Sequence, residues 1–209
     1  MDAKNERLLE LAATALLALA TVGTAWSAYQ AREWTGEQAQ GTSHATAKRI
    51  GVNREAALAN RQVQIDVATF IAWVDARAQG RSALASFYRA RFRKEFEPAF
   101  NAWLATKPLT NSSAPKTPFE LPRYRLAADR RAQHLELRAA ADSAHAKDAN
   151  ERADNYMLAV VLFASSLFFA GLSTKLHTST AKLVLLGLGA ALFLGTVIWL
   201  ATLPAQLTV

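Results

Sequence analysis

The sequence predicts an all-α membrane protein with three transmembrane helices and a polar helical domain inserted between the first and the second. Three apolar segments are about 20 residues long, which is enough for a helix to cross a bilayer. Charged residues gather in one block, because residues 32–154 hold 20 Lys and Arg and 14 Asp and Glu, while no acidic residue follows Asp154. This distribution excludes a single soluble globule and a disordered chain, and the lack of Cys excludes a disulfide-stapled secreted domain.

The first expected span is 11–31, which follows a short N-terminal segment, 1–10. Four hydroxyl residues interrupt its Leu and Ala: Thr14, Thr21, Thr24 and Ser27. A weakly hydrophobic helix of this kind prefers protein neighbours to lipid. Lys4 and Arg7 before an apolar core also suit a cleaved signal peptide, and that alternative stays open. We expect an uncleaved anchor, since the apolar stretch is longer than a usual signal-peptide core.

The polar insert, 32–154, is expected to be helical. Its early part is rich in Ala, Gln, Glu and Arg, with Gly36, Gly41 and Gly51 as weak points. Apolar residues then recur at helical spacing in two stretches. They are Val63, Val67, Phe70, Ile71 and Val74 in the first, and Leu84, Phe87, Tyr88, Phe92 and Phe96 in the second, followed by Phe100, Trp103 and Leu104. We expect these aromatic side chains to form a small core.

A loop and a long helix are expected to complete the insert. Residues 107–122 contain four prolines and cannot hold a regular helix. From Arg123 onward no Gly or Pro occurs before the second expected span, 155–174, so one helix of about 50 residues should run through both. Such a helix would couple the insert mechanically to the membrane.

The remaining segments are a basic loop at 175–182, a third expected span at 183–204 and a tail at 205–209. Pro204 is a natural stop for the third helix. The short polar segments are basic, with Lys4 and Arg7 in one and Lys175 and Lys182 in the other. Both would lie on the cytoplasmic side by the positive-inside rule, which places the insert in the periplasm.

Aromatic residues at the ends of the expected spans are typical of anchors at the membrane interface. They are Trp26, Tyr29, Trp34, Tyr156 and Trp199. All of them fall at the ends that face the insert.

Small residues mark two faces for close helix contact. The first face is Thr14, Ala18, Thr21 and Ala25, and the second is Gly187, Ala191 and Gly195. One interpretation is packing within the three-helix unit. The other is contact between subunits, with the Thr face lining a polar axis.

The sequence contains no catalytic or metal-binding motif, so we expect no enzymatic activity and no cofactor. The four histidines, His44, His134, His145 and His177, form no metal-ligand spacing and have no Cys to share a metal with. Asp142 and His145 could touch on a helix face, but a solvated polar face explains them better. Ser165 and Ser166 are expected to bond back to their own helix.

The basic insert does not predict nucleic-acid binding, because its positive and negative residues are interleaved rather than clustered. The densest basic run is Arg89, Arg91, Arg93 and Lys94. We interpret this run as a contact for anionic lipid or an acidic partner.

Four stretches resemble a bacterial family of small three-pass membrane proteins without an established activity. They are AWSAYQAREWTGEQA (25–39), QIDVATFIAWVDA (64–76), FYRARFRKEFEPAFNAWLATKPL (87–109) and RADNYMLAVVLFASSLFFAGLSTKL (152–176). The resemblance implies a three-pass layout in a bacterial inner membrane and implies no cofactor or substrate.

Two functional hypotheses follow. The first is a non-enzymatic homo-oligomer in the inner membrane that forms a channel for ions or small solutes. The second is an envelope scaffold or accessory protein whose helical insert binds another membrane or periplasmic protein.

Overall fold

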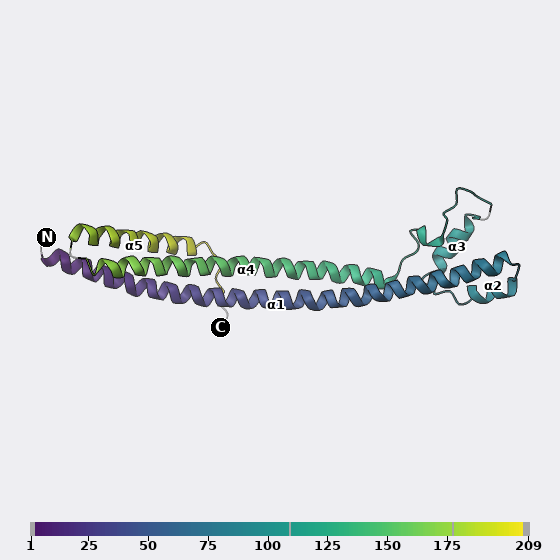
Figure 1. Ribbon diagram of the computed structural model, residues 1–209, viewed down its shortest axis with the longest axis horizontal. Helices are drawn as coiled ribbons and strands as arrows, with labels where there is room; N and C mark the ends of the chain where they lie inside the picture. Colours follow the sequence, from purple (N-terminus) through teal and green to yellow (C-terminus); the bar gives the residue numbers. More distant parts are fainter. Residues whose placement is uncertain (1–2, 109, 177, 207–209) are drawn as a thin grey trace. The chain divides into compact units, whose positions relative to one another are not determined.

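The structure is a computed structural model that describes residues 3–108, 110–176 and 178–206. The described residues form helices and no β-strand, as the sequence predicts (Figure 1). The helices are α1 (Ala3–Ala78), α2 (Ser82–Arg89), α3 (Glu97–Ala105), a short 3₁₀ helix η1 (Pro118–Glu120), α4 (Ala127–Ser173) and α5 (Ser179–Leu200).

The chain divides into two compact units. The terminal unit consists of Met1–Ser43 and Asp142–Val209, and the central unit is His44–Ala141. Helices α1 and α4 each contribute residues to both units.

Three helices in the described part of the chain, α1, α4 and α5, are long and apolar enough to cross a membrane. The first is not a simple span, because α1 continues well beyond the expected boundary at residue 31 to Ala78. The expected weak points, Gly36, Gly41 and Gly51, all lie inside this continuous helix. Gly41 and Gly51 do not break α1, since each lies against α4: a Cβ on Gly41 would be 3.0 Å from the Cβ of Ala146, and one on Gly51 would be 3.2 Å from Leu135.

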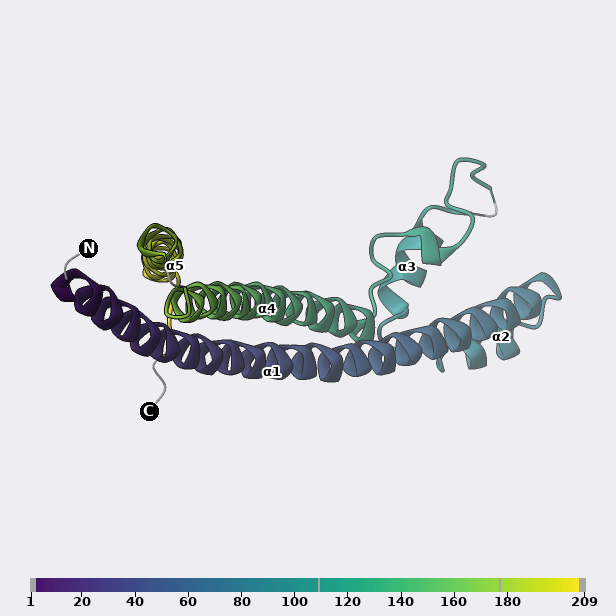
Figure 2. The ribbon, with the colours of Figure 1, turned by 60° about the vertical axis from the view of Figure 1, so that its left-hand side comes forward.

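Helix α4 confirms the expected continuous helix, which begins at Ala127 rather than Arg123 and ends at Ser173. It runs alongside α1 in both ribbon views (Figures 1 and 2). Within the terminal unit the pair is antiparallel, because Gly23 lies against Phe163 while Gly41 lies against Ala146.

Most buried residues of α1 and α4 in the terminal unit are small, and their spacing places them along one side of each helix. The buried ones include Ala13, Ala20, Ser27 and Ala31 of α1 and Ala146, Ala149, Ala153, Ala159 and Ala170 of α4. This spacing keeps one stripe of each helix facing the other, and the lack of bulk lets the backbones approach closely.

The central unit has the aromatic core that the sequence predicts, with corrections. Its buried members are Phe70, Trp73, Ala76, Ala85, Phe92, Phe96, Phe100 and Trp103, and Leu84, Tyr88, Leu104, Phe119 and Tyr124 pack around them. Ile71, Val74 and Phe87 are not core residues, since they are 60%, 41% and 49% exposed. Trp73 is a core residue that the predicted set omits.

The expected second helix of the insert is split. Helix α2 ends at Arg89, and a series of turns leads to α3, whose first turn holds Pro98. Proline fits the first turn of a helix, where its missing N–H has no partner to lose. The turns bring the rings of Phe92, Phe96 and Phe100 together. The ring centroids of Phe92 and Phe96 are 5.0 Å apart, and those of Phe92 and Phe100 are 4.8 Å apart.

The proline-rich loop contains no α-helix, as expected, but it does contribute to the core. Phe119 in η1 stacks on Phe96 at 5.2 Å, and the indole N–H of Trp103 donates to the carbonyl of Pro115 at 2.8 Å. These contacts hold a segment without regular α-helix against the aromatic core.

Candidate functional site

A buried polar cluster lies beside the aromatic core of the central unit. Its first member is Asp66, which has no exposed surface. Asp66 lies on the inward stripe of α1, between Gln62 and Phe70, because residues four apart share a face of a helix. The aromatic residues that bury α1 therefore bury a carboxylate with it.

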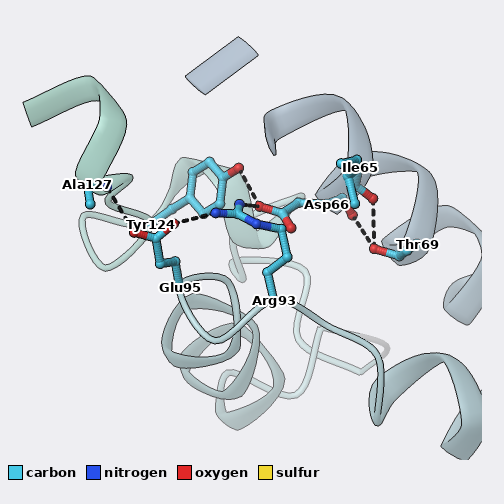
Figure 3. A network of polar contacts seen from close by, with 7 residues as sticks. All are labelled: Ile65, Asp66, Thr69, Arg93, Glu95, Tyr124 and Ala127. Carbon is cyan, nitrogen blue, oxygen red and sulfur yellow. Dashed lines mark hydrogen bonds and ion pairs between the residues drawn. The ribbon is translucent and has the colours of Figure 1, made fainter. Parts of the chain in front are cut away.

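Two donors bind the same oxygen of Asp66 (Figure 3). Arg93 Nη1 lies 2.8 Å from Asp66 Oδ2, and the Tyr124 hydroxyl donates to Oδ2 at 3.0 Å. Arg93 comes from the turns between α2 and α3, and Tyr124 comes from the segment before α4. One carboxylate oxygen thus joins three parts of the central unit.

Glu95 extends the cluster to the start of α4. Its carboxylate forms an ion pair with Arg93, and its Oε1 accepts from the backbone N–H of Ala127 at 3.0 Å (Figure 3). Ala127 is the first residue of α4, where backbone N–H groups have no partner within the helix. A carboxylate is also favoured there by the helix dipole.

The electrostatics of the cluster favour the uncharged form of Asp66. Burial raises the pKa of its carboxyl above the ordinary value of 3.8, and the hydrogen bond from Tyr124 and the charge of Arg93 offset only part of that effect. Burial, followed by the hydrogen bond to Asp66, raises the pKa of the Tyr124 phenol. The phenol therefore remains a donor at every physiological pH.

A groove opens next to the cluster, also within the central unit. Its volume is about 520 Å³, and Tyr124 forms part of its wall. The other lining residues are Ala59, Asn60 and Val63 of α1, then Arg125, Leu126, Asp129, Arg130 and Gln133. Apolar side chains and two guanidinium groups could receive a small molecule with an acidic group, although Asp129 lies at the same opening.

Nothing in the described ranges groups three metal-binding side chains together. His44, His134 and His145 are exposed and are not members of the cluster around Asp66, and His177 lies outside the described residues. Asp142 has an interaction in the structure, and the structure does not single out a contact between Asp142 and His145.

The basic run at 89–94 is not one surface. Arg93 is held by Asp66 and Glu95, so it is a structural residue of the cluster. Arg91 lies over the ring of Phe87 at 3.4 Å, and Arg89 donates to Asn101 at 3.1 Å. Lys94 is exposed.

In the terminal unit, the expected Thr face of α1 points away from the helix contacts. Thr14, Ala18, Thr21 and Ala25 are all exposed. The hydroxyls of Thr14 and Thr21 donate to the carbonyls of Glu10 and Leu17, each at 2.8 Å.

The expected stripe on α5 is likewise uncovered. Gly187, Ala191 and Gly195 are exposed, and a Cβ on either glycine would meet nothing within 4 Å. The close approach between α4 and α5 occurs instead at Gly189, where a Cβ would lie 3.2 Å from the carbonyl oxygen of Ser166. Ser166 donates to the Gly189 carbonyl at 2.8 Å, so it joins two helices rather than bonding back, whereas Ser165 does bond back to Val161.

The five expected interfacial aromatics fall into two groups. Trp26 and Tyr29 are each 43% exposed and contact each other, and Trp199 is half-buried. Trp34 and Tyr156 are buried between α1 and α4, with the guanidinium of Arg152 4.5 Å from the Trp34 ring. These two are packing residues of the terminal unit.

The segment after α5 is bound to α1 and α4 by a contact that the sequence does not reveal. The buried Gln30 amide donates to the Gln206 carbonyl and accepts from the Gln206 N–H, both at 2.8 Å. Tyr156 donates to the Pro204 carbonyl at 3.3 Å. Only a buried Gln in an otherwise apolar segment could have suggested a specific partner.

Sequence reasoning also missed the cluster around Asp66. A signal was available, because Asp66 lies four residues before Phe70 on the apolar face of the predicted helix. Its partners could not be found in the same way, since Arg93 and Glu95 lie where the sequence predicts a helix and the structure has turns, and Tyr124 lies in the irregular segment before α4.

No family model, curated protein or solved structure matches this chain. The resemblance to a three-pass bacterial family therefore stays a prediction.

Proposed function

We propose that this chain is a three-pass protein of the bacterial inner membrane that acts without catalysis, by assembling with copies of itself. Large apolar side chains remain exposed on the terminal unit, which supports lipid as its solvent. They include Leu11, Leu19, Val22, Met157, Val161, Phe168, Leu183, Val184, Leu194 and Ile198. A water-soluble protein rarely leaves so many large apolar side chains uncovered on helices of this length.

In this proposal the central unit lies in the periplasm. Lys175 and Lys182 and the basic residues before the first span support a cytoplasmic position for the short segments. The spans proper would be the apolar parts of α1, α4 and α5.

The observation that carries self-assembly is the pair of small-residue faces that the described residues leave uncovered. Gly187 and Gly195 have open space in front of them, while α4 and α5 already pack through Gly189. Small residues let membrane helices approach closely and form many van der Waals contacts, which lipid chains do not reproduce. A helix of a second copy would form these contacts.

The test is the mass of the protein in lipid nanodiscs, measured by native mass spectrometry. We expect an oligomer for the unmodified chain and a smaller species for Gly187→Leu combined with Gly195→Leu. Gly171→Leu is the matched control, since a Cβ at Gly171 also meets nothing within 4 Å but lies on α4. A monomer for the unmodified chain would defeat the proposal.

Within such an oligomer the Thr face of α1 would surround a conduit for ions or small solutes. Thr14 and Thr21 keep acceptor capacity on an exposed face, which supports this arrangement. Currents in reconstituted bilayers should vanish in Thr21→Leu and persist in Thr180→Leu, where the exposed Thr lies in the first turn of α5.

A scaffold role is the second candidate, and exposed apolar residues of the central unit favour it. Ile50, Ile65, Ile71, Val74, Phe87 and Leu137 are each at least 41% exposed. A stoichiometric partner that copurifies, together with the absence of any current, would favour this role over the channel.

A further inference from the structure

Only one oxygen of the buried Asp66 carboxylate is bound. Oδ2 accepts from both Arg93 and Tyr124, while Oδ1 is buried and has no hydrogen-bond partner. A charged carboxylate can only accept hydrogen bonds, so Oδ1 requires a donor. The described residues supply none.

A second unpaired acceptor lies one helical turn away. Gln62 Oε1 is also buried without a partner, and Gln62 and Asp66 share the inward face of α1 at the i, i+4 spacing. Two buried acceptors on one face, both unpaired, are costly. Residues at this spacing are neighbours on a helix surface, so a hydrogen atom shared by the two oxygens is within reach of both side chains and would satisfy both acceptors.

We propose that Asp66 and Gln62 form a proton-binding site, in which a proton from solvent adds to Asp66 Oδ1 and is donated to Gln62 Oε1. Oδ2 continues to accept from Arg93 and Tyr124. No other ligand is needed, since the proton changes Oδ1 from an acceptor into a donor.

The surroundings of Asp66 act in both directions. The charge of Arg93 and the hydroxyl of Tyr124 favour the carboxylate, whereas burial and the charge of Glu95 favour the protonated acid. Arg93 and Glu95 come from the turns before α3, and Tyr124 from the segment before α4. Burial is the largest of these effects and leaves the pKa raised. Once Asp66 is neutral, Glu95 is the remaining carboxylate partner of Arg93.

The experiment is an infrared pH titration of the full-length protein in lipid nanodiscs. Subtracting the spectrum of Asp66→Asn isolates the carbonyl stretch of the protonated Asp66 carboxyl. Its midpoint should lie above 3.8, the ordinary value for Asp. In Gln62→Met, which removes the acceptor at similar volume, the midpoint should fall by about one pH unit. Gln64→Met is the control, because Gln64 is exposed on the same helix and should leave the midpoint unchanged.

A midpoint that rises in Gln62→Met would overturn the proposal, since it would mean that the Gln62 amide donates to a charged carboxylate. An unchanged midpoint would overturn it too, because Gln62 would then take no part. Asp66→Asn gives a second readout: its amide can donate to Gln62 and still accept from Arg93 and Tyr124. At a pH below the infrared midpoint of the unmodified protein, where Asp66 is protonated, this variant should unfold at a temperature no lower than that of the unmodified protein. A large loss of stability in this variant would show that the site needs the negative charge.

Discussion

Arg93 is the cation that compensates the buried negative charge of Asp66, and the Arg93 side chain is only 21% exposed. Removing one partner of a buried ion pair leaves the other charge uncompensated, which typically destabilises a protein by about 3–5 kcal/mol. The pair joins α1 to a segment that has no helix of its own.

Arg93→Met should therefore lower the free energy of unfolding by about 3 kcal/mol at neutral pH. Without Arg93 the pKa of Asp66 rises further above its unfolded value. The loss of stability is then greatest at a pH above the pKa that Asp66 has in the folded variant. It shrinks as the pH falls toward the unfolded pKa, because the folded variant takes up the proton at a higher pH than the folded unmodified protein does. Denaturant unfolding at several pH values, followed by the fluorescence of Trp73 and Trp103, measures this.

Lys94→Met is the control for Arg93→Met, since Lys94 is exposed in the same segment. Equal losses in the two variants, or a loss for Arg93→Met that is independent of pH, would contradict the role assigned to the ion pair.

Residue-level features were the least predictable from sequence. Periodicity identified Phe70, Phe96 and Phe100 as core residues, because burial of an amphipathic face follows from spacing. It could not pair Asp66 with Arg93, or Gln30 with Gln206, because contacts between distant segments depend on how the chain folds back.

Elements were more predictable, and the departures have local causes. The proline-rich loop agrees with the sequence, and so does α4, the helix that runs into the second apolar segment. The unbroken α1 runs through the expected weak points Gly36, Gly41 and Gly51, because a glycine lowers the stability of a helix without having to end it. At Gly41 and Gly51 helix α4 lies close enough to compensate.

Two glycines of α1 should respond in opposite ways to alanine. Gly41→Ala should destabilise the protein by about 1–3 kcal/mol, because its Cβ would approach the backbone of Ala146 to 3.3 Å. Gly36→Ala should stabilise it by about 0.5–1 kcal/mol, since its Cβ meets nothing within 4 Å and alanine is the better helix former. Thermal unfolding in detergent compares them, and a gain of stability in Gly41→Ala as large as that in Gly36→Ala would contradict the close packing at Gly41.

Gln30 of α1 binds the backbone of Gln206 in the segment after α5. In Gln30→Leu the N–H of Gln206 loses its acceptor and should exchange with deuterium faster by about one order of magnitude, in line with the loss of roughly 1 kcal/mol. Gln40→Leu, at an exposed site of α1, is the control. Unchanged exchange in Gln30→Leu would mean that other contacts hold this segment.

At the scale of the whole molecule, the account depends on where the charged residues lie. They gather between residues 32 and 154, and the three helices that carry the apolar segments expose much of their surface. Lipid around those segments accounts for both facts. Composition alone predicted this division, because the bilayer excludes charge more strictly than any protein core does.

The most direct test is a labelling experiment in intact bacterial cells, which the absence of native Cys makes clean. A membrane-impermeant maleimide is applied to Asn111→Cys, in the loop of the central unit, and to Thr178→Cys, between α4 and α5. The account predicts that Asn111→Cys is labelled from outside the inner membrane, once the outer membrane is permeabilised, and that Thr178→Cys is labelled only after lysis. Labelling of both positions from the same side, or release of the protein from membranes without detergent, would contradict it.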